Sequence, residues 1–129
     1  MTPEAEQYLA TARQHLADAK KIASFQISSV AAREDYLAGY HAAEACIAER
    51  TGKTAKTHSG LRSEFAQLTK DEPRIDRKFV KFLAQAYELK SLADYGTGSS
   101  KPISAEDARA AIETAENFVD CITKLLSSP

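Results

Sequence analysis

One stretch, from Ser29 to His58, places the tightest limits on how this chain can fold. It reads as a single long helix to about Thr51, a stop at Gly52, and a short basic turn that ends at His58. Apolar residues cover much of the girth of this helix, and a helix of that kind is buried among others. Its small residues, which let neighbouring helices approach closely, are Ala38, Gly39, Ala42, Ala43 and Ala45. We therefore expect the other elements to pack around it.

The rest of the sequence predicts further helices, because alternating strand patterns are almost absent. The expected helices run from about Pro3 to Ser24, Val30 to Thr51, Leu61 to Thr69, Arg74 to Tyr95, and Ser104 (as the cap) to Leu126. A chain of 129 residues that is 43% apolar suits one core. The prediction is an all-α single domain over 1–129, an antiparallel up-and-down bundle of four long helices plus one short helix.

Composition narrows the classes of function. A net charge of -1 argues against a protein that is basic overall and coats nucleic acid, but it leaves room for a local basic patch. No apolar run approaches the roughly 20 residues that span a bilayer, and the polar start MTPEAEQYLATARQ is not a secretory signal. Cys46 and Cys121 form no C-x-x-C pair, which favours reduced thiols over a disulfide or redox role. We expect a cytoplasmic protein without a membrane segment.

The basic turn is the strongest candidate site. Lys53, Lys56 and His58 lie just before a predicted helix, and Arg62 follows in its first turn. The N–H groups of a helix N-terminus and adjacent cations attract phosphate. The alternative is a turn that is simply solvated.

Other patterns are weaker. Gly52-Lys53-Thr54 is not a phosphate-binding loop, since Ile47 stands where that loop needs a glycine and no strand precedes it. His41-x-x-Glu44 could ligate a metal only with further carboxylates, and a hydrogen-bonded pair is the alternative. His15 is expected at the boundary of an apolar stripe. We predict no metal and no cofactor.

Two charged groups lie near the predicted fourth helix. Lys90 and Asp94 are four residues apart and can form an ion pair; together with Tyr95 they could instead form a polar cluster in a groove. A second basic run consists of Arg74, Arg77, Lys78 and Lys81. Because acidic residues interleave with this run, we expect a solvated face.

Four groups of residues together resemble a known family. The first two are Arg33-x-x-Tyr36 with Tyr40-His41-Ala42-Ala43-x-Ala45, and then Gly52, Lys56, His58, Gly60 and Phe65. The others are Tyr87-Glu88-Leu89-Lys90-x-x-Ala93-Asp94-Tyr95, and Ser104-Ala105-Glu106-Asp107-Ala108 with Ala115-Glu116-x-Phe118. In this order they resemble the HEPN (higher eukaryotes and prokaryotes nucleotide-binding) domain family over nearly the whole chain.

The resemblance implies an antiparallel bundle of four or five helices, often a homodimer. It also implies a role in RNA cleavage, in RNA or nucleotide binding, or in toxin–antitoxin and defence systems. Many members are encoded beside a minimal nucleotidyltransferase partner.

The chain departs from the family pattern at two places. Ribonuclease members carry Arg, four to six residues, and then His, whereas seven residues separate Arg33 from His41 and Arg50 from His58. The nearest subfamily usually has Arg at the position of Lys90, and lysine lacks the planar two-pronged grip of a guanidinium. Whether the protein is an enzyme is therefore left open.

Three hypotheses follow. The first is a non-catalytic module that binds RNA, a nucleotide or a nucleotidyltransferase partner through Lys53, Lys56, His58 and Arg62, with Lys90, Asp94 and Tyr95 as further ligand-binding candidates. The second is a metal-independent ribonuclease in which Arg50 and His58 of two chains meet across a dimer. The third is a dimeric structural or regulatory protein whose groove contacts another helix.

Overall fold

The structure is a computed structural model of the chain. It describes the backbone of residues 1–24, 28–95 and 105–127, and the side chains of residues 1–22, 31–87 and 106–127. The helices are α1 (Pro3–Ser24), α2 (Ser28–Thr51), α3 (His58–Thr69), α4 (Arg77–Tyr95) and α5 (Ala105–Ser127). The described residues contain no strand, which confirms the all-α prediction.

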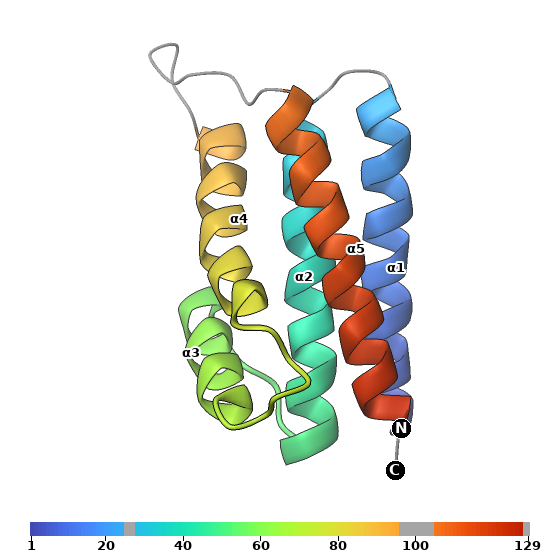
Figure 1. The fold of residues 1–129 in the computed structure, drawn as a ribbon, viewed down its shortest axis with the longest axis vertical. Coiled ribbons are helices and arrows are strands. Elements are labelled where there is room, and N and C mark those ends of the chain that lie inside the picture. The colour runs from blue at the N-terminus through green and yellow to red at the C-terminus, as the bar shows by residue number, and fades with distance from the viewer. Residues whose placement is uncertain (25–27, 96–104, 128–129) are drawn as a thin grey trace.

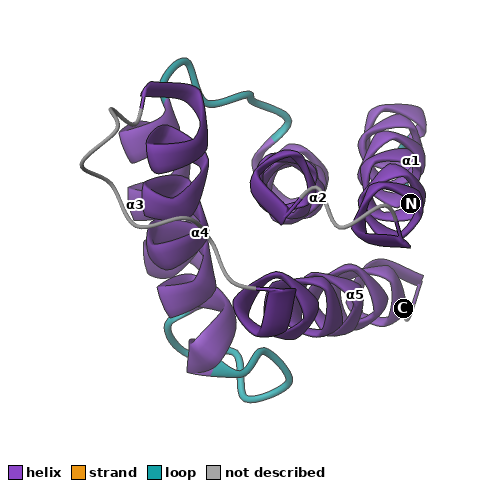
Figure 2. Cartoon of the chain, turned by 90° about the horizontal axis from the view of Figure 1, so that it is seen from above, coloured by secondary structure: helices purple, strands orange, loops and turns teal. Residues whose placement is uncertain are grey.

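The four long helices run alternately up and down, with short α3 beside the start of α4 (Figure 1). Seen from above, α2 lies between α1 on one side and α3 with α4 on the other (Figure 2). On a third side, α5 runs past both α2 and α1 and contacts them. Contacts join α2 to each of the other four helices. The helix predicted to organise the chain is therefore its centre.

The buried surface of α2 consists largely of alanine. Ala31, Ala38, Ala42 and Ala45 are all 0% exposed, so neighbouring backbones come close. At Gly39 an added Cβ would lie 2.8 Å from Cε1 of Phe82 on α4. Because other helices of the same chain cover α2, its apolar girth does not require a second copy, and the homodimer stays a prediction.

Phenylalanine rings fill the space between α3, α4 and α5. Phe118 of α5 is 0% exposed, and its ring centroid lies 5.4 Å from that of Phe65, 4.9 Å from Phe79 and 6.2 Å from Phe82. Burying aromatic side chains in this way is a large apolar contribution to stability. This cluster fixes the position of α3 and α4 on the rest of the bundle.

The end of α2 and the start of α3 show why the chain turns here. Gly52 has a positive φ of 70°, which confirms the predicted glycine stop. α3 begins at His58 rather than at Leu61, because Thr57 is the N-cap and its hydroxyl accepts from Gly60 N–H at 2.9 Å. A Cβ on Gly60 would approach that hydroxyl to 2.8 Å, so glycine suits the cap. The correction brings His58 into the helix.

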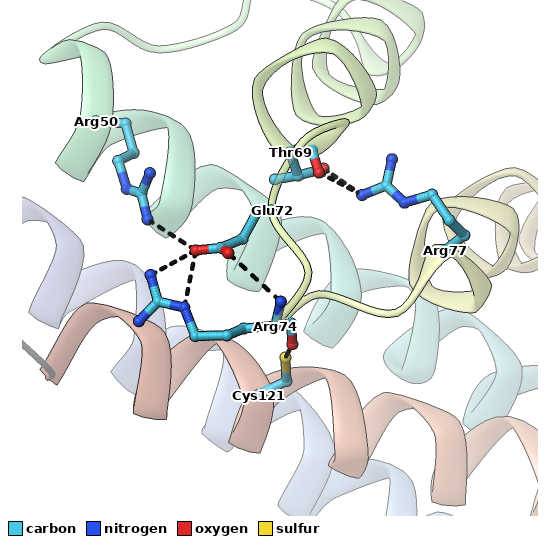
Figure 3. Close-up of polar contacts among 6 residues, drawn as sticks. All are labelled: Arg50, Thr69, Glu72, Arg74, Arg77 and Cys121. Carbon is cyan, nitrogen blue, oxygen red and sulfur yellow. Dashed lines mark hydrogen bonds and ion pairs between the residues drawn. The ribbon is translucent and has the colours of Figure 1, made fainter.

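α4 begins at Arg77, so the predicted start at Arg74 was wrong by one turn. Asp76 caps this helix, with its carboxylate accepting from Lys78 N–H at 2.9 Å. Arg77 donates to the backbone oxygen and the hydroxyl of Thr69, each at 2.8 Å (Figure 3). The residues before Arg77 therefore form a loop held between two helix ends.

Glu72 anchors that loop (Figure 3). Its Oε1 accepts from Nε of Arg74 at 2.9 Å and lies 3.9 Å from a guanidinium nitrogen of Arg50. The thiol of Cys121 on α5 donates to the carbonyl of Arg74 at 3.3 Å. The second basic run is exposed at all four cations, as predicted, and two of them also hold the loop.

Two further expectations can be compared with the structure. None of the helices in the described ranges is both long and apolar enough to cross a membrane. Cys46 and Cys121 are free thiols, the first buried and the second half-buried, in agreement with the prediction of reduced cysteines.

Candidate functional site

His58 lies at the junction of three helices. Its Nδ1 forms a hydrogen bond with the hydroxyl of Tyr36 on α2. Its ring centroid lies 4.9 Å from that of Tyr40 on α2 and 5.5 Å from that of Tyr87 on α4. We call Tyr36, Tyr40, His58, Arg62 and Tyr87 the α2–α3–α4 corner. The candidate histidine therefore turns toward the protein and forms part of a built cluster.

Tyr36 is the buried base of this corner. Its side chain is 0% exposed, and burial raises its pKa far above the usual value of a phenol, against an opposing effect of Arg62. Tyr36 therefore keeps its proton at neutral pH and can donate to an unprotonated Nδ1 of His58. If the imidazole is protonated, the phenol oxygen accepts instead. The bond thus holds the ring in place in either charge state.

Arg62 lies on the same face of α3 as His58, because the two are four residues apart. Its guanidinium carbon lies 4.7 Å from the ring centroid of Tyr87, within the range of a cation–π interaction. Its Nη1 is buried and has no hydrogen-bond partner among the protein atoms. A buried donor of this kind costs free energy unless something accepts from it, and a side-chain hydrogen bond with Tyr36 already engages the guanidinium of Arg62.

The two lysines of the predicted basic turn lie apart from this cluster. Lys53 and Lys56 are exposed in the loop between α2 and α3, and the backbone N–H of Lys53 bonds to the hydroxyl of Thr51 at 3.1 Å. The N-cap reduces the number of free N–H groups at the start of α3, because Gly60 N–H already donates to the hydroxyl of Thr57. The N-terminus of α3 is thus a weaker anion site than the sequence implied. Anion binding at the corner would depend more on its side chains.

The remaining candidates fall elsewhere. The side chains of Lys90, Asp94 and Tyr95 lie outside the described residues, so their predicted ion pair and polar cluster stay predictions. Arg50 lies near Glu72 (Figure 3), and the arginine that shares a ring cluster with His58 is Arg62.

His41 and Glu44 form the hydrogen bond that was the alternative to a metal site, with Nδ1 2.8 Å from Oε1. Within the described part of the chain, no group of three or more His, Cys, Asp and Glu side chains is placed to hold a metal ion.

A separate cleft of about 460 Å³ lies between the loop before α4 and the end of α5. Its lining residues are Arg74, Asn117, Asp120, Cys121, Lys124 and Leu125. Glu72 already accepts hydrogen bonds from both Nε and Nη2 of Arg74, and Asp120 adds a negative charge to the lining. This cleft therefore suits a phosphate less well than the corner does.

Sequence reasoning missed the tyrosines as site residues. It placed Tyr36 and Tyr40 on an apolar helix side and used Tyr87 only in a family motif. The available signal was spacing, because Tyr36 and Tyr40, like His58 and Arg62, are four residues apart and project from one helix face. Nothing in the sequence alone says that these two faces meet.

The helical bundle and its aromatic, cationic corner can be compared with known proteins. The model of the HEPN domain matches residues 5–125, and the chain belongs to this family. It is also similar to a UPF0332 protein of Gloeobacter violaceus, with 28% identity over 127 residues that cover 98% of this chain and 99% of the relative. The resemblance inferred from the motif residues is confirmed.

Proposed function

We propose that the α2–α3–α4 corner binds a nucleotide unit, either free or within single-stranded RNA, and does not cleave it. The observation that carries the proposal is the placement of Arg62. Its guanidinium carbon lies 4.7 Å from the ring centroid of Tyr87, and the ring of His58 lies 5.5 Å from the same ring, so a cation and two aromatic rings meet at one place. Proteins hold unstacked bases on aromatic or guanidinium planes and hold phosphates with cations. Membership of the HEPN family agrees with this class of ligand.

The charges around the corner support the same reading. The exposed Lys53 and Lys56 lie in the loop that leads into His58, outside the corner, so the cation that a phosphate would meet in the corner is Arg62. Such binding weakens as salt rises, because phosphate contacts release counterions. The corner therefore combines aromatic rings with the guanidinium of Arg62.

The direct experiment is a titration of labelled single-stranded RNA and of ATP with the full chain. Arg62→Ala should lower the affinity for both RNA and ATP by about tenfold or more. Arg62→Lys should keep only part of the wild-type affinity, because lysine lacks the planar fork of the guanidinium. Lys56→Ala combined with His58→Ala should also weaken binding. Lys20→Ala is the matched control, since Lys20 pairs with Glu116 of α5 at 2.9 Å, away from the corner. Equal affinity in wild type and Arg62→Ala would refute the proposal.

The alternative is a metal-independent ribonuclease with His58 as acid or base. One observation favours it: His58 and Arg62 lie on one face of α3 and both contact Tyr87. Against it stands the missing Arg-x4-6-His motif. The assay is incubation of mixed RNA with the protein and a chelator, in which we expect intact RNA. If wild type cleaves the RNA and His58→Ala does not, the ribonuclease would be the correct function and binding alone would be rejected.

Partners and compartment are also proposals. A homodimer and a complex with a minimal nucleotidyltransferase are proposed from the family, as a toxin–antitoxin pair or as a regulatory assembly. Sedimentation of the chain alone, and co-elution with a nucleotidyltransferase encoded beside it, test the two separately. Free thiols at both cysteines agree with the cytoplasm as the compartment.

A further inference from the structure

The proposed function leaves unused the cleft between the loop 70–76 and the end of α5. Its volume of about 460 Å³ lies in the range of small-molecule sites. Leu125, only 5% exposed, gives the cleft an apolar surface. The thiol of Cys121 on α5 donates to the carbonyl of Arg74 in the loop, so a hydrogen bond joins the two walls (Figure 3).

The two walls carry opposite charges that do not pair with each other. Arg74 lines the cleft from the loop and its side chain is 57% exposed. Asp120 lines it from α5 and is also exposed. Within the described part of the chain, Asp120 forms neither an ion pair nor a hydrogen bond. A ligand with one charge of each sign would therefore bridge the two walls.

The cation on the loop is held in place before any ligand arrives. Oε1 of Glu72 accepts from both Nε and Nη2 of Arg74 and lies 3.9 Å from a nitrogen of Arg50. These two bonds use two of the five N–H donors of a guanidinium. Two guanidiniums share one carboxylate, so this group of three keeps one positive charge. Because its orientation is already fixed, Arg74 loses little freedom when it binds a carboxylate.

We propose that this cleft binds a short peptide with free ends. The ammonium group of the peptide lies at Asp120, its terminal carboxylate at Arg74, and an aliphatic side chain on Leu125. The mixed charges that make the cleft unsuited to a phosphate are the ones that such a zwitterion needs. A dipeptide also holds its two charges farther apart than a single amino acid does, which suits charges on facing walls. This site is separate from the corner and does not depend on it.

Cys121 serves as the reporter of occupancy, because it lines the cleft whereas Cys46 is buried. The assay is the rate at which the neutral reagent N-ethylmaleimide alkylates Cys121 in the full chain, with the modified site assigned by mass spectrometry. Millimolar alanyl-leucine should slow this rate at least about threefold, since a bound peptide covers the thiol. The N-acetylated peptide and the peptide amide should each protect at most about one third as well, because each lacks one charge.

Two variants assign the ends of the peptide. With Asp120→Asn, alanyl-leucine should protect no better than its N-acetylated form does. With Arg74→Gln, the free acid and the amide should protect equally. Glu113→Gln, the matched loss of a carboxylate on the exposed surface of α5 outside the cleft, should leave protection as in wild type. Rates are compared with each variant's own rate without peptide.

Each outcome decides for or against the peptide site. Absence of protection by alanyl-leucine in wild type would overturn it, and so would equal protection by the free and the blocked peptides. AMP should leave the rate unchanged, and protection by AMP equal to that by the dipeptide would also reject a peptide site. If circular dichroism shows that Arg74→Gln unfolds, Asp120→Asn and the blocked peptides decide. The corner is tested separately, through Arg62, so either proposal can fail alone.

Discussion

Replacing Asp35 with asparagine should abolish most of the loss of stability that the protein undergoes as pH rises from about 4 to about 8. Asp35 lies on α2, one turn before Gly39, and its side chain is 0% exposed. Neither carboxylate oxygen has a hydrogen-bond partner. Burial raises the pKa of Asp35 to about 8, and the charge of Glu34 adds to the rise. A carboxyl in this position is held in its neutral form.

The sign of the pH dependence follows from proton binding. In the unfolded chain an aspartate has a pKa of about 3.9. Between that pH and about 8, the unfolded state has released the proton and the folded state still holds it. Stability therefore falls as pH rises through this window, and the loss is complete above the folded pKa. At pH 7 the loss amounts to at most about 4 kcal/mol, since each unit of difference is worth about 1.4 kcal/mol.

That loss is large beside the roughly 5 to 15 kcal/mol that stabilises a typical domain. The assay is urea unfolding followed by circular dichroism at several values of pH, for wild type and Asp35→Asn. The informative quantity is the difference between the two proteins, because contributions of groups other than Asp35 cancel in it. It should be near zero at the acidic end and grow toward pH 8, with the variant more stable.

The matched control is Asp120→Asn, the same chemical change on the exposed surface of α5. It should leave the pH dependence of unfolding unchanged. Parallel curves for wild type and Asp35→Asn would show that the buried carboxyl ionises normally, and the reasoning from burial would then fail. A carboxyl NMR signal of Asp35 that titrates near pH 4 would refute it directly.

Three smaller predictions concern packing and the thiols. Gly39→Ala should lower the free energy of unfolding, measured in urea, by about 1 to 3 kcal/mol. Alanine has the better helix propensity, but its Cβ would lie 2.8 Å from the packed ring of Phe82. Phe118→Ala should cost about 3 to 5 kcal/mol by the same measurement, since the ring is fully buried among three others, and a cost below about 1 kcal/mol would contradict the packing. Burial raises the pKa of the Cys46 thiol to about 11, so Ellman's reagent at pH 7 should modify it only after unfolding, with Cys121 reacting first in the native protein.

The helices were largely predictable because local signals set them. The ends of α1, at Pro3 and Ser24, agree with the pattern of apolar residues, and Gly52 ends α2 through a backbone conformation that favours glycine. The starts of α3 and α4 were misplaced because apolar periodicity was followed there instead of capping. Thr57 and Asp76 were both present in the sequence as cap residues.

The site was predictable only in part. His58 and Arg62 were named as ligand-binding residues from a basic turn, but their partners Tyr36 and Tyr87 come from other helices, 22 and 29 residues away from His58. Which faces of two helices meet depends on packing across the whole bundle, and a local pattern does not contain it. Asp35 was missed for a related reason, since a charged residue next to Glu34 looks solvated in the sequence.

The two faces of α2 therefore serve different ends, and this makes folding and binding separable by mutation. Toward its packed side, α2 offers alanines and the unpaired Asp35, so substitutions there act on stability. On the side that meets α1 and α3 it offers Tyr40 and His41, half-buried and in contact with the rings of His15 and His58. Asp35→Asn should alter unfolding and leave the affinity for RNA as it is, whereas Arg62→Lys should do the reverse. If both variants changed both properties together, the corner would be part of the folding core rather than a surface built on it.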